Sequence, residues 1–164
     1  MAFTYNPQLA ETPSGVVPDI AWGLHEADSM SFLKGEPVYL NVSATAPNLV
    51  TNVATDRQTI YGFALVDATN VTSDNIEIPL LKVDPRFIYK IRTTNAGTAA
   101  TCESFVRGKA YDLYVASNIA YADLDTPGAT ALVFEDFCYD KDGDYDYWGL
   151  FRFIYSVCQP WCGA

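Results

Sequence analysis

The stretch Phe87-Ile88-Tyr89-Lys90-Ile91-Arg92 decides the fold class of this chain. Side chains on a β-strand alternate between its two faces, so the stretch places Phe87, Tyr89 and Ile91 together on one face. Other short β-rich runs, separated by turn residues, follow one another from Phe32 onward. Because this texture is typical of a sandwich or a barrel, we predict an all-β fold, a small β-barrel or β-sandwich with an extended N-terminal arm.

The expected strands share a high content of β-branched and aromatic residues. They cover residues 37–42, 60–66, 76–80, 87–92, 111–116, 129–137 and 149–157. The second of these runs is too apolar for a surface strand and is expected to be central, with Gly62 and Ala64 allowing close packing across its face. Pro79 marks the third run as an edge strand, and residues 101–107 are the best candidate for a helical turn.

Prolines punctuate the first part of the chain and exclude both a helix and a central strand there. They are Pro7, Pro13 and Pro18, accompanied by Gly15 and Gly23. We therefore predict an extended arm at residues 1–30 and a single β-barrel domain at residues 31–164. Phe3 and Trp22 supply apolar anchors for the arm, which either lies along its own domain or reaches over a neighbouring subunit.

The formal net charge of −10 excludes the usual basis of nucleic-acid binding, which is the displacement of counterions by Lys and Arg. Residues 111–146 carry nine acidic side chains against one base, Lys141. These acids are Asp112, Asp123, Asp125, Glu135, Asp136, Asp140, Asp142, Asp144 and Asp146. A solvated face is the favoured explanation of this charge, and a surface that recognises a partner is the alternative.

The cysteines are interpreted from the compartment that the sequence predicts. The N-terminus lacks the basic start and the apolar core of a signal peptide, and no apolar run approaches the roughly 18 residues of a membrane span. We expect a protein made in a cytosol and not inserted in a membrane. A reducing compartment favours free thiols at Cys102, Cys138, Cys158 and Cys162, with a disulfide or a metal site as alternatives.

The sequence carries no recognisable catalytic constellation. Its one histidine, His25, lies among the prolines and glycines of the arm, which makes a His-based triad or a multi-His metal site hard to assemble. Phosphate-binding loops, dinucleotide fingerprints and Gly-x-Ser-x-Gly elbows are absent. A carboxylate pair for glycoside hydrolysis is not tested by such motifs, because its two members need not be near each other in sequence. We predict that the chain is not an enzyme and uses no cofactor.

An acidic stretch, Tyr-Asp-Lys-Asp-Gly-Asp-Tyr-Asp-Tyr-Trp-Gly at residues 139–149, is the most conspicuous motif. It is not an EF-hand loop, because Tyr145 and Phe151 stand where that loop needs Gly and Glu. We interpret it as a hairpin tip whose aspartates point into solvent. Calcium chelation by Asp140, Asp142 and Asp144 is the weaker alternative.

Several of the β-rich runs occur in an order that resembles the capsid cement, or head decoration, proteins of tailed bacteriophages. In those proteins a Gly-x-x-Val strand, a Gly-x-Ala strand and a Gly-x-x-Tyr-x-Leu element recur in a small β-barrel. The matching segments here are Lys34-Gly35-Glu36-Pro37-Val38-Tyr39-Leu40, Ile60-Tyr61-Gly62-Phe63-Ala64-Leu65-Val66-Asp67-Ala68, Ile76-Glu77-Ile78-Pro79-Leu80, Arg107-Gly108-Lys109-Ala110-Tyr111-Asp112-Leu113 and Leu150-Phe151-Arg152-Phe153-Ile154. The acidic stretch and residues 158–162 do not belong to that pattern.

The resemblance implies a mechanical function. Such proteins bind the outer face of an assembled head, commonly as trimers, and clamp neighbouring major capsid subunits against the pressure of packaged DNA. It implies the major capsid protein and a homotrimer as partners, and a place on the capsid exterior after synthesis in the host cytoplasm.

Two other functions agree with the same sequence features. One is a different virion structural module, in a tail or a head fibre, which also needs an all-β fold and an acidic surface. The other is a carbohydrate-binding β-sandwich that uses exposed Tyr and Trp as stacking platforms and the acidic stretch for calcium. Aromatic residues of β-proteins more often lie in the core, which disfavours this last alternative.

If the acidic stretch is only a solvated hairpin tip, replacing Asp140, Asp142 and Asp144 together with Asn should leave the melting temperature and assembly nearly unchanged. Exposed like charges are screened by salt and contribute little to stability. Thermal melts of both proteins, with calcium and with EDTA, measure this. A calcium-dependent rise in the melting temperature of the parent, lost in the triple variant, would identify the three aspartates as ligands.

Overall fold

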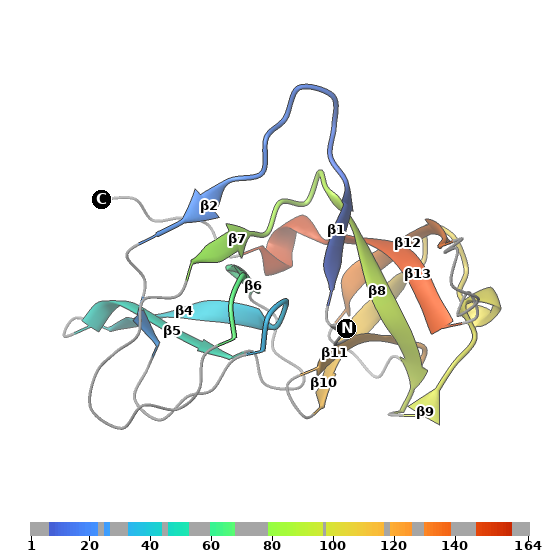
Figure 1. Ribbon diagram of the computed structural model, residues 1–164. Helices are drawn as coiled ribbons and strands as arrows, with labels where there is room; N and C mark the ends of the chain where they lie inside the picture. Colours follow the sequence, from blue (N-terminus) through green and yellow to red (C-terminus); the bar gives the residue numbers. More distant parts are fainter. Residues whose placement is uncertain are drawn as a thin grey trace.

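The computed structural model describes residues 7–22, 25–26, 33–43, 46–52, 60–67, 79–96, 98–116, 119–125, 130–138 and 147–158. These residues form an all-β fold, as predicted, with strands arranged in two sheets (Figure 1). The barrel sheet contains β1 (Gln8–Glu11), β8 (Ile88–Asn95), β9 (Thr98–Ala99), β10 (Ala110–Ala116), β11 (Ile119–Asp123), β12 (Thr130–Phe137) and β13 (Trp148–Phe153). The second sheet contains β2 (Ile20–Ala21), β3 (His25–Glu26), β4 (Pro37–Ser43), β5 (Ala46–Asn52), β6 (Gly62–Ala64) and β7 (Leu80–Lys82).

Strand β8 closes the barrel sheet into a ring. It pairs in parallel with β11 and antiparallel with β13. Because β11 also pairs with β10, β10 with β12, and β12 with β13, these strands and β8 form a closed barrel. Closure pairs the backbone N–H and C=O groups that the edge strands of an open sheet would leave unpaired.

Aromatic side chains fill the barrel. Phe87, Tyr89 and Ile91 are all buried, which confirms that they share the inward face of the strand predicted there. Their neighbours inside are mostly rings, and the centroids of adjacent rings lie 4.5 to 5.8 Å apart. The other buried rings of this cluster are Phe63, Phe105, Tyr111, Phe134, Phe151 and Phe153. The protein therefore obtains its core largely from phenylalanine and tyrosine, which bury more apolar area per residue than aliphatic side chains.

The second sheet packs against the barrel through Phe63 of β6. The Phe63 ring lies 5.3 Å from the Tyr89 ring and 5.6 Å from the Phe153 ring, measured between centroids. In the sheet, β6 is flanked by β7 and β4, which confirms its predicted central position. The two sheets thus share one hydrophobic cluster.

Gly62 shows why a small residue is required beside Phe63. A Cβ atom at this position would lie 2.5 Å from the carbonyl oxygen of Leu81 on β7. That distance is shorter than van der Waals contact, and the oxygen that blocks the added atom belongs to the backbone. This close approach is to the neighbouring strand within the sheet, so the close packing predicted across the face of the strand stays a prediction.

The described part of the arm joins both sheets. β1 pairs with β8 and β2 pairs with β7, each at the edge of its sheet, and the connection between them crosses from one sheet to the other (Figure 1). This placement agrees with the prolines, which exclude a central strand but not an edge strand. The division into an arm at 1–30 and a domain at 31–164 stays a prediction.

Three details differ from the sequence prediction. β7 is not an edge strand, because β2 of the arm pairs with it. Pro79, on which the edge prediction rested, lies just before β7 and outside it. The last predicted strand ends at Phe153 and is followed by the 3-10 helix η3 (Tyr155–Val157). β5 and β11 were not predicted, since one carries a proline and the other is rich in alanine. Residues 76–78 lie outside the described residues, and the expected helical turn is the short 3-10 helix η1 (Cys102–Ser104).

Substituting Gly62→Ala should lower the free energy of unfolding by about 1 to 3 kcal/mol, because the added methyl meets the backbone of β7. Urea denaturation followed by circular dichroism measures the change. Ala10→Ser, at an exposed position of the edge strand β1, is the control and should be nearly neutral. Equal stability of Gly62→Ala and the parent would contradict the close approach of β6 and β7.

Candidate functional site

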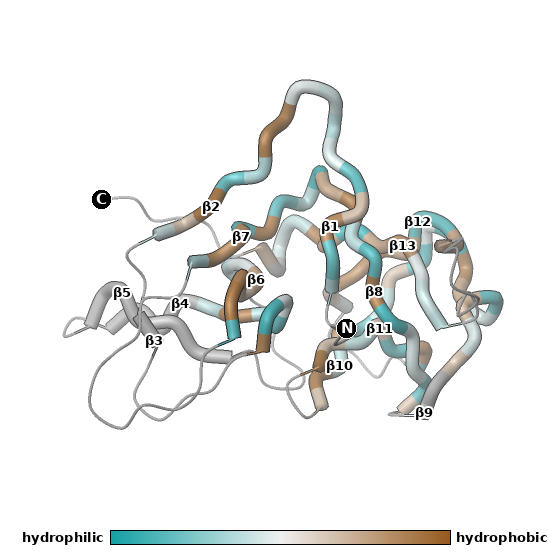
Figure 2. Tube along the Cα trace, viewed as in Figure 1, coloured by the Kyte–Doolittle hydropathy of each residue, from teal (hydrophilic) through white to brown (hydrophobic). Residues whose placement is uncertain are grey.

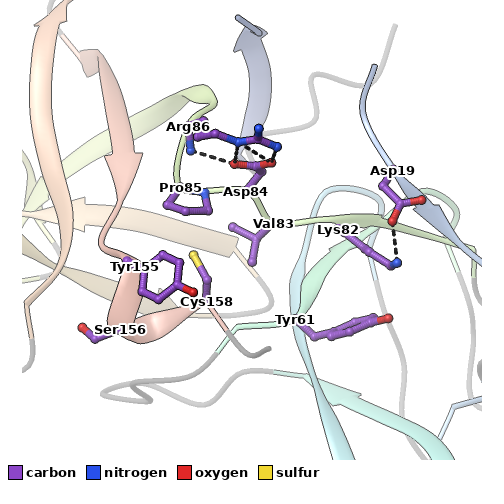
Figure 3. Close-up of a pocket in the computed structure, with 10 residues that line it drawn as sticks. All are labelled: Asp19, Tyr61, Lys82, Val83, Asp84, Pro85, Arg86, Tyr155, Ser156 and Cys158. Atoms are coloured by element: carbon purple, nitrogen blue, oxygen red, sulfur yellow. Dashed lines mark hydrogen bonds and ion pairs between the residues drawn. The ribbon is translucent and has the colours of Figure 1, made fainter. Parts of the chain in front are cut away.

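A cleft lies at the junction of the barrel and the second sheet, and we call it the seam cleft (Figure 3). Its volume is about 680 Å³. Tyr61 and Lys82 contribute to it from the second sheet, and Arg86 and Tyr155 from the barrel side. The connection from β7 to β8 runs between these walls and contributes Val83 and other residues.

Two ion pairs line the seam cleft (Figure 3). Lys82 Nζ lies 2.5 Å from Asp19 Oδ2, which ties the arm to β7. The Arg86 guanidinium donates to both carboxylate oxygens of Asp84, with Nε at 3.0 and 3.2 Å, and the backbone N–H of Arg86 donates to Asp84 Oδ1 at 2.8 Å. These hydrogen bonds from Arg86 hold the pKa of the Asp84 carboxyl below its ordinary value.

Burial shifts the pKa of two further groups of the cleft, Cys158 and Tyr61, toward their neutral forms. Burial raises the pKa of the Cys158 thiol to about 12, so the thiol is protonated at neutral pH and is not a nucleophile. Burial, with a smaller contribution from Asp19, raises the pKa of Tyr61. The cleft therefore offers aromatic rings, hydroxyls and ion-paired groups suited to binding a ligand, and its described residues include no activated nucleophile.

A second candidate surface is the outer side of the arm, which we call the arm surface: Val17, Ile20 and Trp22. Val17 is 83% exposed and Trp22 is 68% exposed. Ile20 and Trp22 flank the buried Ala21, so alternation along β2 directs both of them away from the sheet. Figure 2 shows brown, hydrophobic segments on the same connection between β1 and β2. Clustered apolar side chains of this kind mark surfaces that bind a partner.

The predicted site residues are only partly described. Trp22, predicted as an anchor of the arm, is mostly uncovered by its own chain, while Phe3 lies outside the described residues. The weak metal candidates Asp140, Asp142 and Asp144 also lie outside them. Within the described ranges, no group of three or more His, Cys, Asp or Glu could hold a metal ion. The helices of that part of the chain are also too short to cross a membrane.

The described cysteines are not joined to one another. Cys102, Cys138 and Cys158 form no disulfide within the described residues. The reduced state expected for their thiols stays a prediction. Burial raises the pKa of the Cys102 thiol to about 12. Cys162 lies outside the described residues.

No protein-family model, curated protein or solved structure matches this chain. The candidate site therefore rests on geometry. Sequence reasoning missed the seam cleft because its walls come from segments far apart in the chain and share no motif. The one local signal was Asp84-Pro85-Arg86, a turn with opposite charges two residues apart.

Asp84→Asn should lower stability at neutral pH by about 1 kcal/mol, because it removes the charge that the Arg86 guanidinium binds. The folded-state pKa of Asp84 is depressed, so this stabilisation is present above the ordinary Asp pKa of about 4 and is lost as the pH falls. Urea denaturation from pH 3 to 7 should show the two stability curves converging at the acid end. Glu11→Gln, an exposed acid on β1, controls for the loss of a surface charge. A constant difference across this range would show that the ion pair is not its source.

Proposed function

We propose that this chain is a structural virion protein that binds the outer surface of an assembled phage head and cements neighbouring major capsid subunits. The observation that carries the proposal is the arm surface. Val17, Ile20 and Trp22 are exposed on a segment that is held to both sheets, so their apolar area is presented on a fixed scaffold. Tryptophan is among the residue types that most often dominate the energy of protein binding.

The architecture supports a mechanical function. The barrel is closed, its core is filled with aromatic rings, and the arm is paired with both sheets. A load applied to the arm would therefore reach the barrel through β8 and the second sheet through β7. The resemblance of the sequence to head decoration proteins points in the same direction.

Association into a homotrimer is part of the proposal. Three copies presenting three arm surfaces to one lattice would bind by avidity, so that each contact can be weak while the assembly holds firmly. The net charge of −10 keeps free copies soluble despite these exposed apolar side chains.

Trp22→Ala should weaken binding to purified heads that lack the protein by about tenfold or more, because truncating a central aromatic anchor typically costs 2 kcal/mol or more. Co-sedimentation of labelled protein with heads measures the affinity. Val106→Ala, at an exposed apolar position after η1, is the matched control and should bind like the parent.

Three outcomes separate the proposal from its alternatives. A parent protein that stays monomeric and does not bind heads would contradict it. Unchanged binding by Trp22→Ala would remove the arm surface from the contact. Labelled protein located on tails in negative-stain images of virions would favour the other virion module.

A further inference from the structure

We propose that the seam cleft is a binding site for a neutral carbohydrate. This inference does not rest on head binding, because the cleft and the arm surface use different side chains. Three features of the cleft are its basis. The charged side chains are paired, one aromatic ring is uncovered, and the backbone amides already donate hydrogen bonds within the chain.

The charges of the seam cleft balance. Asp19 is paired with Lys82 and Asp84 with Arg86, so the ionic side chains of the lining sum to zero. An anionic ligand would have to compete with the carboxylate that is already bound to each basic side chain. A cationic ligand would have to compete with the basic side chain that is already bound to each carboxylate. This arrangement favours a ligand without net charge.

The uncovered aromatic ring is Tyr155, whose side chain is 82% exposed at the mouth of the cleft. The backbone on both sides of Tyr155 is nevertheless anchored by hydrogen bonds. The preceding Ile154 N–H donates to the Ala131 carbonyl of β12 at 2.9 Å, and the Cys158 N–H donates back to the Tyr155 carbonyl at 3.2 Å. Figure 3 shows Tyr155 and Tyr61 contributed from the two sides of the cleft. An uncovered ring on an anchored backbone is suited to stacking against the apolar C–H face of a pyranose.

The ion pairs also supply hydrogen bonds suited to sugar hydroxyls. Each hydroxyl both donates and accepts, and a carboxylate beside a guanidinium presents an acceptor next to a donor. Arg86 and Asp19 are mostly exposed while they keep their partners, so they remain accessible from the cleft. Val83 and Pro85 add apolar surface between them. The volume of about 680 Å³ falls within the range of roughly 300 to 1,000 Å³ that is usual for ligand sites.

A peptide strand is a poorer occupant for the same cleft. Addition of a strand requires unpaired backbone groups along an edge. Here the Lys82 N–H donates to the Asp19 carbonyl at 2.9 Å, the Val83 N–H donates to the Tyr61 carbonyl at 3.0 Å, and the Phe87 N–H donates to the Asp84 carbonyl at 3.0 Å. These amide groups of the β7–β8 connection are already satisfied within the chain.

The test uses the full chain on an array of neutral oligosaccharides of glucose, mannose, galactose and N-acetylglucosamine, with matched sulfated and sialylated members. We expect binding of at least one neutral oligosaccharide, unaffected by EDTA. Calorimetric titration with that oligosaccharide should show at least a tenfold loss of affinity for Tyr155→Ala and a several-fold loss for Arg86→Ala. Tyr155→Phe should keep most of the affinity, since it preserves the ring, and Val106→Ala should match the parent.

The variants lie at exposed positions, and circular dichroism and melting curves verify that they fold. Absence of binding to every neutral oligosaccharide would overturn the inference, as would binding restricted to the charged members. Undiminished affinity in Tyr155→Ala would place the ligand elsewhere, and loss of binding in EDTA would indicate a calcium-dependent site instead. Because head binding is measured separately with Trp22→Ala, failure of either proposal leaves the other standing.

Discussion

The pairing of β8 with strands on both sides is the constraint on which the rest of the structure depends. β8 bonds to β1 and β11 and to β13 and β9, and its inward side chains Tyr89 and Ile91 enter the aromatic core. Without these pairings the barrel would open and the arm would lose its partner on that sheet. Since the contact with Phe63 is made by Tyr89, β8 also fixes where the second sheet packs.

The seam cleft is lined by residues of both parts of the fold. Phe63 of the second sheet contacts Tyr89 and Phe153 of the barrel, and the β7–β8 connection contributes residues 83–86 to the cleft. Two ion pairs line the cleft beside aromatic and apolar side chains, so each of its charged side chains has a partner. Asp19 of the arm lines the cleft and is followed in the chain by Ile20, so the seam cleft and the arm surface are neighbours.

Much of the fold could be predicted from local pattern. Alternation in residues 87–92 and the apolar run 60–66 predicted an inward face and a central strand, because buried strands impose period and composition on their own sequence. β11 escaped prediction because its alanines, Ala120 and Ala122, are buried without a strong propensity signal. The edge assignment based on Pro79 was wrong because the covering strand β2 comes from the arm, far away in the sequence.

By itself the sequence determined the fold class and the central position of β6. These follow from the period and the composition of the strands, which are local properties of the chain. Only the tertiary structure decided that β8 closes a barrel, that Trp22 is exposed, and that Asp19, Asp84 and Tyr155 line one cleft. Residues far apart in the chain become neighbours through strand pairing, and no local sequence pattern predicts which strands pair.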